Sequence, residues 1–198
     1  MKRFDRELHL IMWAAETDGA GGITDWDILL DGCRKGDRKA QKRLFDRLSP
    51  KMFPLCIRYM GNREAAEDVL QEGFITLFSR LDSYAGKGSF EGWARRLFVN
   101  TALMQLRKND ALAGSDDIDA ARSLSSEAPS AVETLGYREL MKLIASLPEG
   151  LRTVFNLYVI EGYSHKEIAE ALGMEEATSR SKLQRARIRL QELMKGIR

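Results

Sequence analysis

The sequence predicts an all-α protein in which a flexible acidic linker joins two small helical domains. Apolar residues recur at helical spacing through residues 24–108 and again from residue 131. The stretch between these blocks is rich in Ala, Ser and Asp and has no such period. A capped helix, a glycine turn and a basic helix near the C-terminus form a helix-turn-helix pattern. The expected division is an N-terminal extension (1–23), a first domain (24–108), a linker (109–130) and a second domain (131–198).

The first 22 residues have a pattern of their own. Phe4, Leu8 and Ile11 mark one face of a short amphipathic helix, and a glycine-rich break follows it. This segment is either a weakly ordered appendage, such as one left by an upstream start codon, or a contact helix for a partner; we favour the appendage. Its apolar stretch is too short and too interrupted for a signal peptide.

Four helices are expected in the first domain. They occupy about residues 24–36, 40–59, 66–81 and 90–108. Pro50 and Pro54 interrupt the second, where we expect a bend. The turn-rich loop at 82–89 separates the third from the fourth, and Ser89 is a suitable cap for the fourth.

The third helix carries an acidic and amide face, formed by Glu67, Asp68, Gln71 and Glu72. Asp68 and Glu72 are four residues apart, so they share a helix face and suit metal binding or acid/base chemistry. No histidine accompanies them, since the chain has only His9 and His165. A solvated or partner-facing acidic patch is therefore the favoured interpretation, and no metal or cofactor is expected.

Basic and amide groups line the fourth helix. They are Arg95, Arg96, Asn100, Gln105, Arg107 and Lys108, whereas Trp93 belongs to the apolar stripe expected to face the core. Such a set suits a nucleic-acid interface, and an ordinary solvated face is the alternative.

The helix-turn-helix pattern begins at Ser164, which with Glu167 forms a capping box. Gly173 stands where a helix C-terminus favours a left-handed residue. Residues 178–198 include seven basic residues and only one acidic residue, Glu192. The side chains best placed for base edges or the DNA backbone are Thr178, Ser179, Arg180 and Lys182, and Arg185 suits a phosphate contact. The alternative is a helical hairpin with a solvated basic face.

Charge, cysteine content and hydropathy limit the class of protein to which the chain can belong. A net charge of +2 is too small to indicate nucleic-acid binding by itself. Cys33 and Cys56 lack zinc-site spacing and lie in apolar helical patterns, so we expect buried thiols in a reducing cytoplasm. No apolar run is long enough to cross a membrane.

Two blocks, residues 65–108 and 147–190, resemble conserved regions two and four of the extracytoplasmic-function (ECF) sigma factors. The resemblance implies a subunit without catalysis that binds core RNA polymerase and promoter DNA. Region two would bind core polymerase through Asp68, Gln71 and Glu72. It would read the minus-ten element with the loop 83–89 and with Trp93, Arg95, Arg96, Asn100 and Arg107. Region four would read the minus-thirty-five element with Thr178, Ser179, Arg180, Lys182 and Arg185. A membrane-bound anti-sigma factor is a further partner that the family suggests, and no small-molecule substrate is expected.

Two rival functions remain open. A helix-turn-helix regulator that acts without polymerase explains the second domain. It does not explain the function of the acidic face on the third helix or of the basic fourth helix. A helical metal-dependent hydrolase lacks a histidine cluster, a phosphate loop and a paired nucleophile and base.

Overall fold

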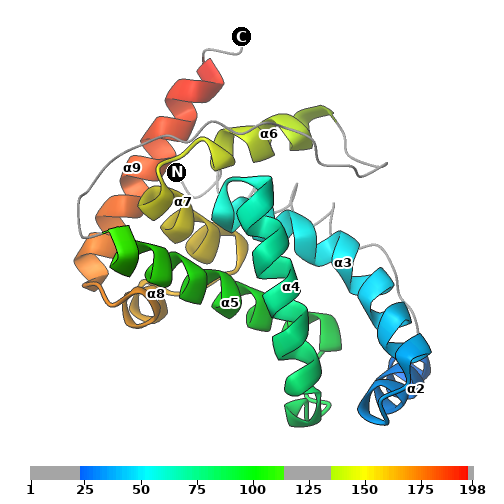
Figure 1. The fold of residues 1–198 in the computed structure, drawn as a ribbon. Helices are drawn as coiled ribbons and strands as arrows, with labels where there is room; N and C mark the ends of the chain where they lie inside the picture. Colours follow the sequence, from blue (N-terminus) through cyan, green and yellow to red (C-terminus); the bar gives the residue numbers. More distant parts are fainter. Residues whose placement is uncertain (1–22, 114–134, 196–198) are drawn as a thin grey trace. The chain divides into compact units, whose positions relative to one another are not determined.

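The computed structural model describes residues 23–113 and 135–195, and all the regular structure in these parts is helical (Figure 1). The described residues fall into two compact units, one built mainly from α2 to α5 and the other from α6 to α9. The all-α prediction is confirmed. The expected N-terminal helix and most of the expected linker lie outside the described residues.

In the part of the chain that the structure describes, the first unit contains four α-helices and a short 3-10 turn. They are α2 (Ile23–Arg34), α3 (Arg38–Met60), α4 (Arg63–Ser79), η1 (Leu81–Ser83) and α5 (Phe90–Ala113). Pro50 and Pro54 lie inside α3 without ending it. α5 continues five residues beyond the predicted boundary at residue 108, into the segment expected to be linker.

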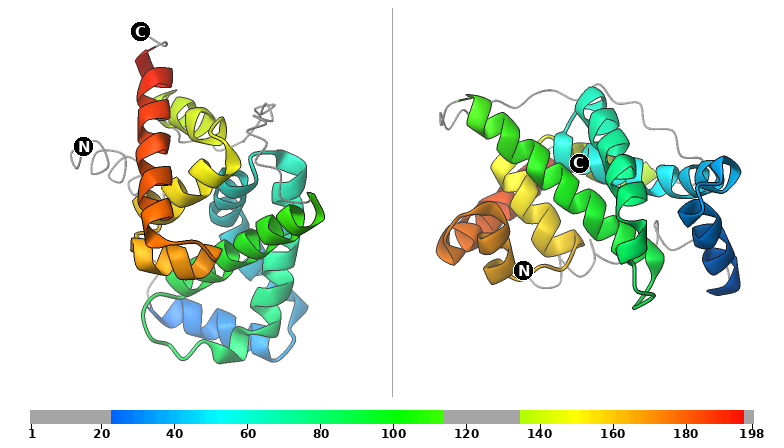
Figure 2. Two further views of the ribbon diagram at one scale, coloured as in Figure 1. Left: turned by 90° about the vertical axis from the view of Figure 1, so that its left-hand side faces the viewer. Right: turned by 60° about the horizontal axis from the view of Figure 1, so that its bottom comes forward.

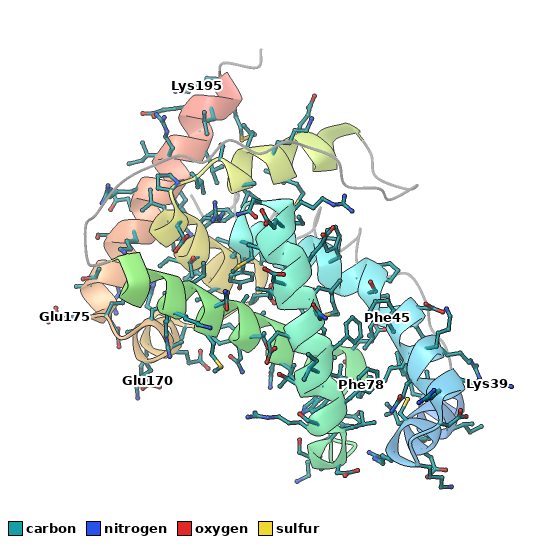
Figure 3. The ribbon with its side chains drawn as sticks, viewed as in Figure 1. Lys39, Phe45, Phe78, Glu170, Glu175 and Lys195 are labelled. Carbon is teal, nitrogen blue, oxygen red and sulfur yellow. The ribbon has the colours of Figure 1, made fainter. Side chains whose placement is uncertain are left out.

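Aromatic rings from three helices pack against one another in this unit. The ring of Phe74 on α4 lies 4.5 Å from that of Phe45 and 5.2 Å from that of Phe98, measured between centroids. Figure 3 shows Phe45 on α3 and Phe78 on α4 in the space between these helices. Cys33 and Cys56 are buried in the core of this unit, as predicted. Burial raises the pKa of the Cys33 thiol, and the nearby Asp37 carboxylate acts in the same direction.

Gly73 permits the close approach of α4 and α5, which lie against each other in Figures 1 and 2. A Cβ atom at this position would overlap the ring of Phe98, which is fully buried. Neither residue can move without shifting a helix, because the surrounding core is close-packed.

We therefore expect Gly73→Ala to destabilise the protein by about 1–3 kcal/mol, although alanine is the better helix former. Chemical denaturation followed by circular dichroism measures this change. Combining it with Phe98→Leu, which makes room for the new methyl group, should cost less than the sum of the two single substitutions. A stabilising Gly73→Ala would contradict the packing described.

Among the described residues, the second unit contains four α-helices and one π turn. They are α6 (Leu135–Ala145), α7 (Glu149–Phe155), η2 (Asn156–Ile160), α8 (His165–Leu172) and α9 (Glu176–Lys195). Figure 2 shows α9 running alongside α6 and α7. Its buried residues Leu183, Ala186 and Leu190 supply one side of the core.

The helix-turn-helix forms as its local signals predict. The Ser164 hydroxyl accepts a hydrogen bond from the Glu167 backbone N–H, and the Glu167 carboxylate accepts one from the Ser164 N–H. Gly173 ends α8 with φ of 66°, in the left-handed region. These two features fix where α8 starts and stops, and so place α9 across it.

Candidate nucleic-acid interface

A groove between α4 and α5 brings together two sets of residues that the sequence suggested separately. It encloses about 920 Å³. Asp68, Gln71 and Glu72 line the wall formed by α4, and Trp93, Arg96 and Asn100 line the wall formed by α5. The other two candidates on α5, Arg95 and Arg107, do not line it.

The walls of this groove differ in charge. The α4 wall presents two exposed carboxylates, with Arg80 just beyond the end of that helix, whereas Arg96 and Lys108 stand on the α5 wall. Two apolar side chains that line the groove are also exposed: Ile75 on α4 at 56% and Met104 on α5 at 69%. An exposed apolar pair flanked by opposite charges is typical of a surface that binds another macromolecule.

The loop before α5 is held in a defined shape by its own contacts. The Tyr84 hydroxyl donates a hydrogen bond to the Gly88 carbonyl at 2.8 Å. The Tyr84 ring lies 5.2 Å from Phe90 and 5.5 Å from Trp93, between centroids. Gly86 adopts a φ of 73°, which favours glycine over other residues. The loop is therefore preformed beside the Trp93 end of the groove.

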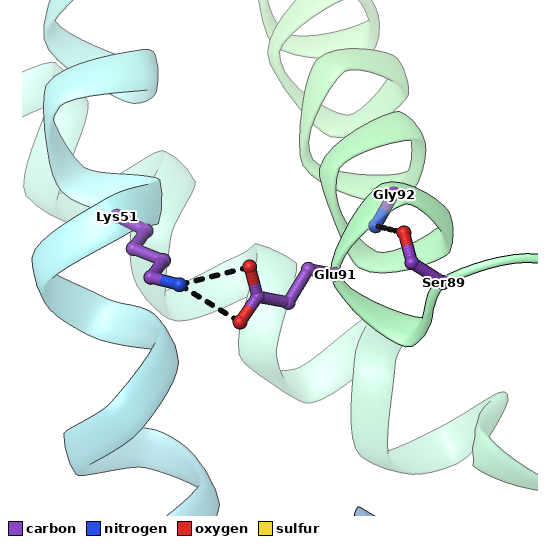
Figure 4. A network of polar contacts seen from close by, with 4 residues as sticks. All are labelled: Lys51, Ser89, Glu91 and Gly92. Atoms are coloured by element: carbon purple, nitrogen blue, oxygen red, sulfur yellow. Dashed lines mark hydrogen bonds and ion pairs between the residues drawn. The ribbon is translucent and has the colours of Figure 1, made fainter. Parts of the chain in front are cut away.

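The first turn of α5 is fixed from two sides (Figure 4). The Ser89 hydroxyl accepts a hydrogen bond from the Gly92 N–H at 3.0 Å, which confirms the predicted cap. The Lys51 ammonium on α3 meets both carboxylate oxygens of Glu91 at 2.8 Å. Sequence analysis missed this pair, because residues 40 positions apart give no local signal.

The candidate DNA contacts on α9 fall into two groups. Thr178, Arg180 and Arg185 are exposed, and Arg180 pairs with Glu176 one turn earlier. The other two candidates point elsewhere. Ser179 is fully buried, so it has no free surface for DNA, and this part of the sequence interpretation is corrected. Lys182 is half-buried, and its amine lies close to Gly150 on α7. A Cβ atom added at Gly150 would be only 2.9 Å from the Lys182 Nζ atom.

The buried Ser179 hydroxyl has a partner that the sequence analysis did not identify. Its oxygen lies 2.9 Å from Nδ1 of His165, at the start of α8. The His165 ring in turn stacks on Tyr158, with centroids 4.4 Å apart and planes inclined by 24°. This contact joins the two helices of the helix-turn-helix near their first turns.

His165 is disposed to remain neutral. Burial lowers its pKa from the usual 6.5, and the positive charges of Arg180 and Arg187 lower it further, while Glu176 opposes them. Because the pKa is lower in the folded state, the unfolded chain binds more protons between that lowered value and the usual 6.5. The contribution of His165 to the free energy of unfolding is therefore complete above about pH 6.5 and is lost as the pH drops through the lowered pKa.

We expect His165→Gln to remove part of this acid sensitivity, because glutamine does not titrate and can still meet Ser179. Thermal unfolding of both proteins between neutral pH and about pH 5 measures the difference. His9, the other histidine, is present in both and cancels. Identical pH profiles would show that His165 does not titrate differently on folding.

The structure describes no helix that is both long and apolar enough to cross a membrane.

Comparisons with known proteins agree on one family. The family model "Sigma-70 region 2" matches residues 44–112, and "Sigma-70, region 4" matches residues 137–190. The ECF RNA polymerase sigma-E factor of Escherichia coli (strain K12) is 34% identical over 176 residues, which cover 83% of this chain and 91% of that protein. The sigma-E factor of Haemophilus influenzae is 31% identical over 176 residues, which cover 83% and 92%.

Solved structures also show the fold. One example is the sigma factor RpoE of Bartonella quintana in complex with the anti-sigma factor NepR, with a TM-score of 0.52 and 24% identity, covering 79% of this chain and 98% of that one. The matches to both conserved regions, in the order found here and over most of the length of the relatives, show that the chain belongs to the ECF family of RNA polymerase sigma factors.

Proposed function

We propose that the chain binds core RNA polymerase through its α4–α5 unit and directs it to promoters that it reads with both units. The observation that carries this proposal is the groove, in which an acidic wall and a cationic wall with an aromatic end face one another. This assigns residues 24–108 to core binding and the minus-ten element, and residues 131–198 to the minus-thirty-five element.

The α4 wall supplies the polymerase contact in this proposal. Asp68, Gln71 and Glu72 are exposed side chains on one helix, and Ile75 extends the same wall with an apolar contact. Exposed carboxylates beside an exposed apolar residue give a partner both a charge to match and an area to bury.

The loop and the α5 wall supply the contact with the minus-ten element. A base taken out of a duplex needs a preformed pocket with stacking and hydrogen-bonding groups. Tyr84 and Trp93 offer aromatic faces, and Arg96 and Asn100 offer donors on the same side of α5. Arg95 and Arg107, outside the groove, remain candidates for phosphate contacts.

The exposed side of α9 supplies the contact with the minus-thirty-five element. Thr178 and Arg180 lie in its first two turns, from which a recognition helix reaches base edges in the major groove. Arg185 lies one turn farther along and suits the backbone. The buried Ser179 acts on DNA only indirectly, by fixing α9 against α8.

The proposed role is that of a subunit without catalysis of its own that works in the cytoplasm. A direct test mixes the purified chain with bacterial core RNA polymerase, isolates the complex, and measures run-off transcription from candidate promoters. The expected result is a stable complex and promoter-specific initiation. Duplex binding by the chain alone, without core binding, would identify a regulator that works without polymerase.

A further inference from the structure

A basic corner lies where α2 meets α3. It comprises the exposed side chains of Arg34, Lys35, Arg38, Lys39, Lys42 and Arg43. Over residues 34–47 there are seven basic side chains and two acidic ones. Figure 3 shows Lys39 pointing away from α3 into open space. Nothing in the proposed contacts with polymerase or with the two promoter elements uses this surface.

The fold neutralises only part of the charge. Lys35 pairs with Asp31 and Lys42 pairs with Asp46, each at 2.6 Å and one helical turn apart. The Asp37 carboxylate instead accepts the Lys39 backbone N–H at 2.8 Å, at the start of α3.

Three cations of the corner have no partner of opposite charge among the described residues. Arg38, Lys39 and Arg43 have no acid within ion-pair distance in the parts of the chain that the structure describes. They lie within two turns of one helix, so they repel one another and raise the local positive potential. Such a cluster favours an anionic ligand that is held by several charges at once.

The corner adjoins the loop that the proposed function assigns to the minus-ten element. The Arg34 guanidinium donates a hydrogen bond to the Tyr84 carbonyl at 3.4 Å, and its Nε lies 3.6 Å from Asp82 Oδ1. The loop also carries an exposed lysine, Lys87. A strand whose base enters the loop and whose backbone continues across α2 would therefore meet the corner next.

We propose that the basic corner binds the phosphates of the single DNA strand that continues from the minus-ten loop. This inference rests on the proposed function. Long, exposed cations suit a backbone track, because they neutralise phosphates without reading sequence. An acidic protein surface would offer the same charge, but contact between the corner and the loop favours DNA.

The test uses holoenzyme, assembled from the full chain and core polymerase, and fork-shaped promoter probes. One probe ends its single strand at the minus-ten element, and two others extend that strand past the element in either direction. The variant is Arg38→Gln, Lys39→Gln and Arg43→Gln combined. The control, Arg38→Lys with Arg43→Lys, keeps every charge.

On one of the extended probes we expect the Gln variant to bind roughly tenfold more weakly near 0.1 M salt, with a salt slope shallower by about 2, because each phosphate on a single strand contributes about 0.7. The short probe should bind equally to variant and wild type. The charge-keeping control should match wild type on every probe.

Unchanged binding on all three probes would overturn the inference, as would equal weakening on all three. Weaker assembly with core polymerase, with DNA binding unaltered, would assign the corner to an acidic protein surface instead. Wild-type holoenzyme that ignores the minus-ten sequence would overturn the proposed function itself, and the inference with it.

Discussion

Core polymerase binding should fall by roughly 10²- to 10³-fold in the variant Asp68→Lys with Glu72→Lys. Both carboxylates are exposed on the α4 wall of the groove, so reversing them should leave folding intact. In the complex, two attractive contacts would become repulsive ones, and like-charge juxtaposition at an interface costs several kcal/mol. Titration of labelled core polymerase measures the affinity, and thermal unfolding checks the fold.

The matched control is Glu64→Lys with Glu67→Lys. It makes the same change of charge on the same helix, at residues outside the groove lining. Its core affinity should stay near that of the wild type. Equal loss in both variants would show that the overall charge of the unit matters rather than the groove, and normal affinity in the Asp68 and Glu72 variant would exclude this wall as the docking site.

Transcription from a promoter that depends on its minus-thirty-five element should fall by about a hundredfold or more in the variant Arg180→Glu with Arg185→Glu, because each arginine contact contributes about 1–3 kcal/mol. Both side chains are exposed on α9, and neither belongs to the core of its unit. Run-off transcription with reconstituted holoenzyme measures the change.

Core binding by this variant should remain normal, because α9 lies outside the unit that carries the groove. Arg180→Lys with Arg185→Lys keeps both charges and should retain much of the activity, although lysine lacks the bidentate geometry of arginine. If the charge-reversed variant supported as much transcription as the wild type, α9 would not recognise DNA through these arginines.

Sequence patterns predicted those features that local chemistry determines. The capping box at Ser164, the left-handed Gly173 and the Ser89 cap each depend on residues within a few positions, and all three form. The helical spacing of apolar residues likewise predicted the four helices of the first unit.

The remaining features depend on residues that are distant in sequence. Ser179 was taken for a DNA contact because it lies on a basic helix, but its position faces His165, 14 residues earlier. Gly73 carries no local signal, and its role appears only where α5 brings Phe98 against it. Joining the acidic and cationic residues into one groove likewise required the packing of α4 on α5.

The fixed first turn of α5 has a consequence for the energetics of promoter opening. The Lys51–Glu91 pair and the Ser89 cap hold this turn, and Tyr84 closes the preceding loop on itself. Ordering a backbone residue costs about 1–2 kcal/mol of conformational entropy, and here that cost is met when the protein folds. A base that leaves the duplex would then enter a receptor that is already rigid, so more of its stacking and hydrogen-bonding free energy would remain to offset the lost base pair.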